Sequence, residues 1–219
     1  MRLLPVIVFL VACQALPIQL IESGAAQETE RGVDQISRLH DVLATGELIV
    51  TDVRGQGASS GTVLDGSLRN TTERSIRIGV WLSRGLYLAS QTETAQNMIA
   101  TAVYGRGGLY YVEDEEPFIE VLLHEVKDVT FNGYCLDFDL ENPTEADSLA
   151  VQPVPPDLSD IIRKLLAYEQ AAGDQEHSTV RAQVALWLER GHAPDEIRER
   201  FDFTDADLNE AYQIRDGTF

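Results

Sequence analysis

Between Glu47 and Val151 the chain alternates apolar and polar residues with a period of two, and Gly, Asn and Pro residues separate the segments. Successive side chains of a strand point to opposite faces, so this alternation indicates strands with one buried face. About eight short segments of this kind predict an immunoglobulin-like antiparallel β-sandwich over residues 47–151. These apolar side chains should be mostly buried: Ile76, Ile78, Val80, Leu86, Leu88, Phe118 and Leu136.

After the proline-rich segment 152–156, apolar residues recur every three or four positions, as they do along one face of a helix. Residues 157–219 are therefore predicted to form a small C-terminal helical bundle, which makes the fold mainly β with α. Pro194 and Thr204 should begin the last two helices, because proline suits a first helical turn and threonine caps one. The side chains expected to pack against the sandwich or neighbouring helices are Val184, Trp187 and Leu188.

Residues 1–26 have the pattern of a secretory signal peptide. A basic residue precedes an apolar run from Leu3 to Ile21, and small residues end at Ala26, where cleavage is expected. The segment Leu10-Val-Ala-Cys13 also matches a lipoprotein signal, which would end before Cys13 and attach a lipid there; an uncleaved anchor is the remaining alternative. We expect a secreted, periplasmic or cell-surface protein, which a lipid on Cys13 would link to a membrane.

The formal net charge is −19, from 36 acidic and 17 basic residues. Nucleic-acid phosphates attract clustered lysine and arginine, so this balance argues against nucleic-acid binding. The 4 histidines are not at metal-ligand spacing, and the sequence has no nucleotide-binding or nucleophile motif. We therefore expect no cofactor, no metal and no conventional enzyme. The acidic run 113–116 offers oxygen ligands for calcium, although its ordinary interpretation is a solvated turn.

Two short segments carry the remaining candidate chemistry. Cys135 lies in Tyr134-Cys-Leu-Asp-Phe138 on a predicted strand, and Gln183 lies in Ala182-Gln-Val-Ala-Leu-Trp187 on a predicted helix. Cys135 is the one cysteine that remains after signal-peptide removal, so an internal disulfide is excluded. It is then buried and inert, paired with another chain, or reactive.

These two segments resemble the motif blocks of thioester domains in bacterial surface adhesins. The resemblance implies that the Cys135 thiol attacks the Gln183 amide carbon, that ammonia leaves, and that an internal thioester remains. Tyr134, Phe138 and Trp187 would supply the apolar pocket that protects the thioester from water. A partner amine would then attack it and become bonded to Gln183. A second glutamine, Gln96, precedes the cysteine and is the weaker candidate.

The sequence thus predicts an exported binding or attachment module that holds a protein or cell-surface partner, with the thioester as its covalent device. Such chemistry happens once per molecule and is at most single-turnover. The alternative is a structural or accessory envelope protein without covalent chemistry. In that case Cys135 is buried and unreactive, Trp187 is a helix core residue, and Gln183 is a surface or capping amide.

Overall fold

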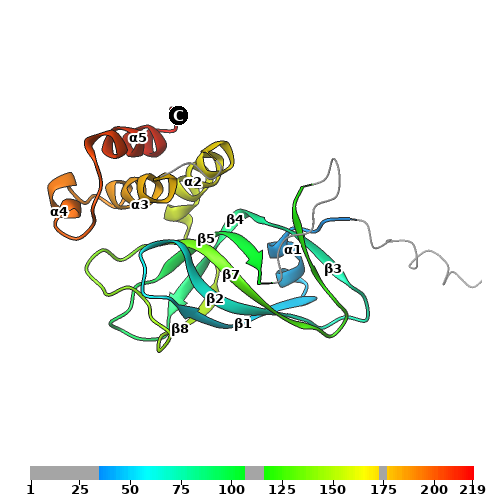
Figure 1. The fold of residues 1–219 in the computed structure, drawn as a ribbon. Helices are drawn as coiled ribbons and strands as arrows, with labels where there is room; N and C mark the ends of the chain where they lie inside the picture. Colours follow the sequence, from blue (N-terminus) through cyan, green and yellow to red (C-terminus); the bar gives the residue numbers. More distant parts are fainter. Residues whose placement is uncertain (1–34, 107–115, 173–176) are drawn as a thin grey trace, which may run out of the picture. The chain divides into compact units, whose positions relative to one another are not determined.

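Six antiparallel strands close into a barrel (Figure 1). Their order around the barrel is β1-β2-β7-β5-β4-β8, and β8 pairs with β1 to complete the circle. The barrel strands are β1 (Leu48–Gly55), β2 (Ser60–Asn70), β4 (Trp81–Ser90), β5 (Met98–Gly105), β7 (Val126–Cys135) and β8 (Ser148–Gln152). A two-stranded sheet pairs β3 (Ile76–Gly79) with β6 (Phe118–Val121).

The computed structural model describes residues 35–106, 116–172 and 177–219, all within the unit Val33–Phe219. The predicted signal peptide 1–26, with Cys13, and residues 113–115 of the acidic run lie outside the described residues, whereas Glu116 is described and exposed. Among the helices of the described ranges, none is long and apolar enough to cross a membrane.

The predicted immunoglobulin-like sandwich followed by a helical bundle is wrong, because the strands form one closed barrel. The short strand β8 decides the outcome: it pairs with β4 along one edge and with β1 along the other. Strands of sandwiches and of barrels both alternate inward and outward side chains. The period-two pattern could therefore locate strands but could not show that the sheet closes on itself.

The C-terminal helices are α2 (Ser159–Ala172), α3 (Ser178–Glu189), α4 (Pro194–Arg198) and α5 (Asp205–Asp216); a 3-10 turn, η1 (Pro156–Leu158), precedes them, and α1 (Leu39–Ala44) precedes β1. Of the C-terminal helices, α2 and α3 pack directly on the barrel, whereas α4 and α5 pack on other helices. α2 contacts β4 and β5, whereas α3 contacts β2, β7 and α5. Pro194 is the first residue of α4, and the Thr204 hydroxyl caps α5 by accepting a bond from the Asp207 N–H, as the sequence predicted for both helix starts.

Irregular pairing bends the strands into the barrel. The register shifts within the pairings of β1 with β2, β2 with β7, β4 with β5 and β5 with β7. Such bulges increase local twist and curvature, which closure requires. Gly133 lets β5 and β7 approach closely, because a Cβ there would lie 2.7 Å from the Ile99 carbonyl oxygen.

One apolar core runs through the barrel and continues under the helices. All the side chains for which burial was predicted are buried, so that prediction is confirmed; they are Ile76, Ile78, Val80, Leu86, Leu88, Phe118 and Leu136. On α3, the three predicted packing residues are also buried: Val184, Trp187 and Leu188. This packing fixes where α3 lies against the end of β7.

Candidate functional site

The structure brings Cys135 and Gln183 together, although 48 residues separate them in the chain. Cys135 is the last residue of β7, and Gln183 lies on the face of α3 that covers the barrel. The Cys135 N–H donates to Gln183 Oε1 at 2.9 Å, and Gln183 Nε2 donates to the Cys135 carbonyl oxygen at 2.9 Å. Both residues are fully buried, so helix and strand are tied together away from solvent.

The end of β7 is where the ladder with β2 runs out. The Cys135 N–H also donates to the Ser59 carbonyl oxygen at 3.0 Å, so it is shared between two acceptors. The Gln183 carboxamide therefore hydrogen-bonds the main chain of Cys135 as a residue of a neighbouring strand would, and continues the pairing by one residue. An N–H held against Oε1 also polarises the amide carbonyl, as backbone donors do in oxyanion holes.

The Cys135 thiol points to a different set of partners. Its Sγ lies 3.2 Å from Met98 Sδ and 3.5 Å from Asn142 Oδ1. Burial, together with the charge of Asp137, raises the pKa of Cys135 to about 12, although the charge of Arg200 acts in the opposite direction. The thiol is therefore protonated at neutral pH, and it is the one free cysteine within the described ranges.

Two of the predicted pocket aromatics pack together near this junction. The rings of Phe138 and Trp187 meet edge to face with centroids 5.1 Å apart. The Phe201 ring also meets the Trp187 ring edge to face, with centroids 5.3 Å apart. Tyr134 lies elsewhere: its hydroxyl donates to Glu169 on α2. Consecutive strand residues point to opposite faces, so Tyr134 and Cys135 cannot share one pocket.

A cavity of about 230 Å³ is lined by Asn142, which contacts the Cys135 thiol, and is here called the junction cavity. It is lined by Ser59, Gln96, Phe138, Asn142, Trp187 and Arg200, together with Glu141. Asn142 connects this cavity to Cys135, because the same residue contacts Sγ. Two buried polar atoms of the lining residues have no hydrogen-bond partner among the described residues: the acceptor Gln96 Oε1 and the donor Trp187 Nε1.

Glu169 forms a buried cluster that the sequence analysis missed. Its Oε1 accepts bonds from Asn132 Nδ2 at 2.6 Å and from the Tyr134 hydroxyl, while Oε2 has no partner among the described residues. Burial raises the pKa of Glu169. The signal was present, because Glu169 falls four and eight positions after Leu165 and Ile161, on the apolar stripe of α2.

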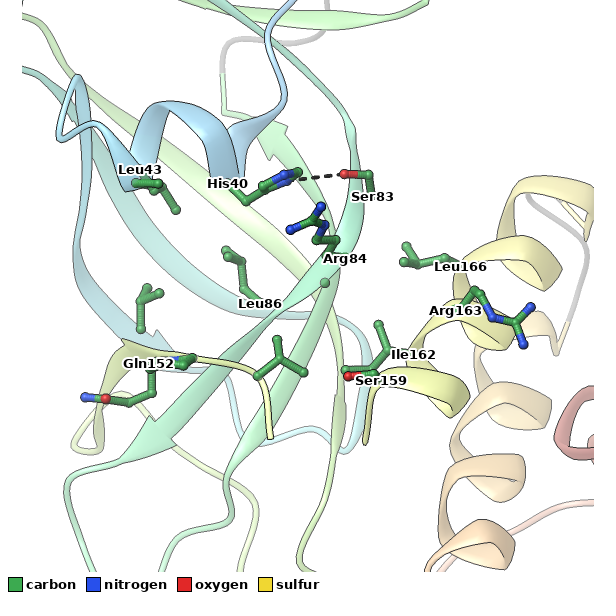
Figure 2. A pocket seen from close by; sticks show the side chains of 15 residues that line it. His40, Leu43, Ser83, Arg84, Leu86, Gln152, Ser159, Ile162, Arg163 and Leu166 are labelled. Atoms are coloured by element: carbon green, nitrogen blue, oxygen red, sulfur yellow. Dashed lines mark hydrogen bonds between the residues drawn. The ribbon is translucent and has the colours of Figure 1, made fainter. Parts of the chain in front are cut away.

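A second, larger pocket of about 790 Å³ lies between α1, β4, the segment after β8, and α2 (Figure 2). Its walls are mainly apolar, from Leu43 and Leu86 on one side to Ile162 and Leu166 on the other. At the α1 end, His40 Nδ1 lies 3.3 Å from Ser83 Oγ. We call this the α1–α2 pocket; it shares no lining residue with the junction cavity.

Metal ligation finds no support in the part of the chain that the structure describes. There, no group of three or more His, Cys, Asp or Glu side chains is placed to hold a metal ion.

Comparison of the chain with protein-family models, with curated proteins and with solved structures finds no match.

Proposed function

We propose that this chain is an exported attachment module in which Cys135 and Gln183 form an internal thioester. The observation that carries the proposal is the contact between these two residues, in which the Gln183 carboxamide is bound to the Cys135 main chain. The two residues chosen from sequence for this chemistry are thus adjacent and fully buried. Burial supports the proposal because a thioester exposed to water hydrolyses.

The chemistry needs no cofactor. The Cys135 Sγ attacks the Gln183 amide carbon, an Sγ–Cδ bond forms, the Cδ–Nε2 bond breaks, and the thiol proton leaves with the nitrogen as ammonia. A partner amine then attacks Cδ. The Cδ–Sγ bond breaks, an amide bond joins the partner to residue 183, and the amine proton passes to Sγ. The Cys135 N–H that bonds Oε1 stabilises negative charge on this oxygen in both steps.

The junction cavity supplies the amine with a route to the thioester. Asn142 lines the cavity and contacts Sγ, so a small group in the cavity lies one side chain away from the reacting atoms. The Glu141 carboxylate, which also lines the cavity, is an acceptor suited to an ammonium group. Arg200 also lines the cavity, and its guanidinium donates hydrogen bonds to the carbonyl oxygens of Phe138 and Leu140. Part of its hydrogen-bonding capacity is therefore already used within the protein.

A purely structural role is the second candidate, and one observation favours it. Both polar atoms of the Gln183 carboxamide already have partners, and burial raises the pKa of the attacking thiol to about 12. In that case Gln183 is a buried tie between α3 and β7, and the chain is an accessory envelope protein without covalent chemistry.

Intact mass separates the two candidates. The thioester form should weigh one ammonia less than the sequence, Cys135→Ala and Gln183→Ala should each restore the full mass, and methylamine should add once to the wild type. Fragmentation should place the methylamine on Gln183 and not on Gln96. Gln213→Ala, which changes an exposed glutamine of α5, is the matched control and should keep the ammonia loss. Full mass in fresh wild-type protein would leave only the structural role.

Export is part of the same proposal and rests on the apolar run Leu3 to Ile21. Protein purified from its source cells should begin after Ala26, or at a lipid-bearing Cys13. N-terminal sequencing that finds Met1 intact on soluble cytoplasmic protein would contradict export, independently of the mass result.

A further inference from the structure

We propose that the α1–α2 pocket binds an aliphatic chain that ends in a carboxylate. This inference concerns residues remote in sequence from Cys135 and Gln183, and it stands whether or not a thioester forms. A volume of about 790 Å³ lies within the range of small-molecule sites, which are usually concave and mostly apolar with few polar groups.

The apolar part of the pocket fits an aliphatic chain. Leu86 comes from β4, Val151 and Val154 come from the end of β8 and the segment after it, and Ile162 and Leu166 come from α2. Among the described residues, no Phe, Tyr or Trp side chain lines the pocket, so its apolar walls offer mainly aliphatic surface for methylene groups. Val151 is 36% exposed, which leaves apolar surface in contact with water until a ligand covers it.

The charged residues that line the α1–α2 pocket indicate which headgroup the ligand carries. The chain has a net charge of −19, yet none of the described Asp and Glu residues lines this pocket, whereas His40, Arg84 and Arg163 do. His40 Nε2 already pairs with Asp41 at 2.8 Å, and Arg163 pairs with Asp160 at 2.6 Å and points away from the pocket (Figure 2). Neither acid lines the pocket.

Arg84 is the remaining arginine of the lining. It has no acidic partner among the described residues, and Figure 2 shows its guanidinium beside His40 at the α1 end of the pocket. A guanidinium binds a carboxylate through two parallel hydrogen bonds. One unpaired arginine complements one negative charge, so a carboxylate matches it better than a phosphate monoester, whose second charge would face the apolar walls.

Titration calorimetry with sodium dodecanoate, below its micelle concentration, tests the assignment. Wild-type protein should bind one dodecanoate about tenfold more tightly than dodecan-1-ol, because only the acid pairs with Arg84. Dodecyl phosphate should bind no more tightly than dodecanoate. Wild-type protein that shows no saturable binding, or equal affinity for the acid and the alcohol, would overturn the proposal, and tighter phosphate binding would overturn the carboxylate assignment.

Three variants locate the ligand. Arg84→Ala should lose the tenfold preference for the acid while dodecanol affinity is unchanged, and Val151→Asp should weaken binding of both. Arg69→Ala, which removes an exposed arginine of β2 outside the pocket, should behave as wild type. Both pocket positions are exposed enough for the variants to fold, which circular dichroism checks. Dodecanoate affinity that is unchanged in Arg84→Ala or in Val151→Asp would place the ligand elsewhere and sink the inference.

Discussion

Removal of the Gln183 side chain tests the tie between α3 and β7 most directly. We would make Gln183→Ala in a Cys135→Ala background, where a thioester cannot form. The tie survives in that background, because both hydrogen bonds of Gln183 use the main chain of residue 135. Cys135→Ala by itself should therefore lower the free energy of unfolding by only about 1–2 kcal/mol, because the cavity left by a buried thiol is small.

The expected loss on Gln183→Ala follows from the contacts. The carbonyl at position 135 loses its donor from Nε2, and an unsatisfied buried acceptor costs about 1–3 kcal/mol. The N–H at position 135 keeps its hydrogen bond to the Ser59 carbonyl oxygen, so the loss of its bond to Gln183 Oε1 costs less than the loss at the carbonyl. Truncation of a fully buried side chain adds about 2 kcal/mol for the lost packing. The free energy of unfolding should fall by about 3–5 kcal/mol, a large part of the stability of a typical domain.

Gln183→Glu keeps almost the same side-chain shape but should make the stability depend on pH. An ionised carboxylate cannot donate to the carbonyl at position 135, whereas a protonated one can. Folding should therefore raise the pKa of the introduced carboxyl. The protonated carboxyl then stabilises the fold fully below the ordinary glutamate pKa of about 4.3, and this stabilisation is lost as pH rises through the pKa of the folded state.

Urea unfolding followed by the fluorescence of Trp81 and Trp187 measures these changes. Gln213→Ala in the same background is the control and should shift the unfolding free energy by less than about 0.5 kcal/mol. A loss for Gln183→Ala that is no larger than this control would refute the tie. A Gln183→Glu variant with the same pH dependence as its parent would refute the bond from Nε2.

Further predictions concern buried groups and one glycine. Glu169→Gln should raise the unfolding free energy at pH 8 by about 1–2 kcal/mol and change little near pH 4, because the raised pKa of Glu169 means that its stabilisation is lost as pH rises through the folded value; equal effects at both pH values would contradict this. Asp207 has a lowered pKa, since bonds from Thr204, Arg181 and His177 outweigh the opposing effect of burial, so Asp207→Asn should cost about 3–5 kcal/mol at pH 7 and progressively less below pH 4; chemical denaturation across pH tests it. Gly85→Ala should cost about 2–4 kcal/mol, because φ is +63° and a Cβ would lie 2.9 Å from Ile162 Cγ2; a thermal scan with an unchanged midpoint would disprove it.

Local periodicity accounts for what the sequence predicted well. The strands are expected to lie between Glu47 and Val151, and the first barrel strand, β1, begins at Leu48; the capping residue Thr204 lies where α5 begins. Each of these depends on residues within one turn or one strand. The resemblance also led to Cys135 and Gln183 as neighbours. Their mode of contact, amide to main chain, was not predicted, because it depends on where α3 meets the end of the β2–β7 ladder.

The sequence by itself determined that strands precede helices and that many apolar side chains are buried, because alternation and helical spacing are properties of neighbouring residues. It did not determine the burial of polar side chains such as Glu169. Closure of the barrel was decided only in three dimensions, since β8 pairs with two strands that are far from each other in the chain. The same holds for the two cavities. Arg84 and Ile162, or Gln96 and Trp187, become neighbours only when α2 and α3 pack on a closed barrel, and no local pattern encodes that meeting.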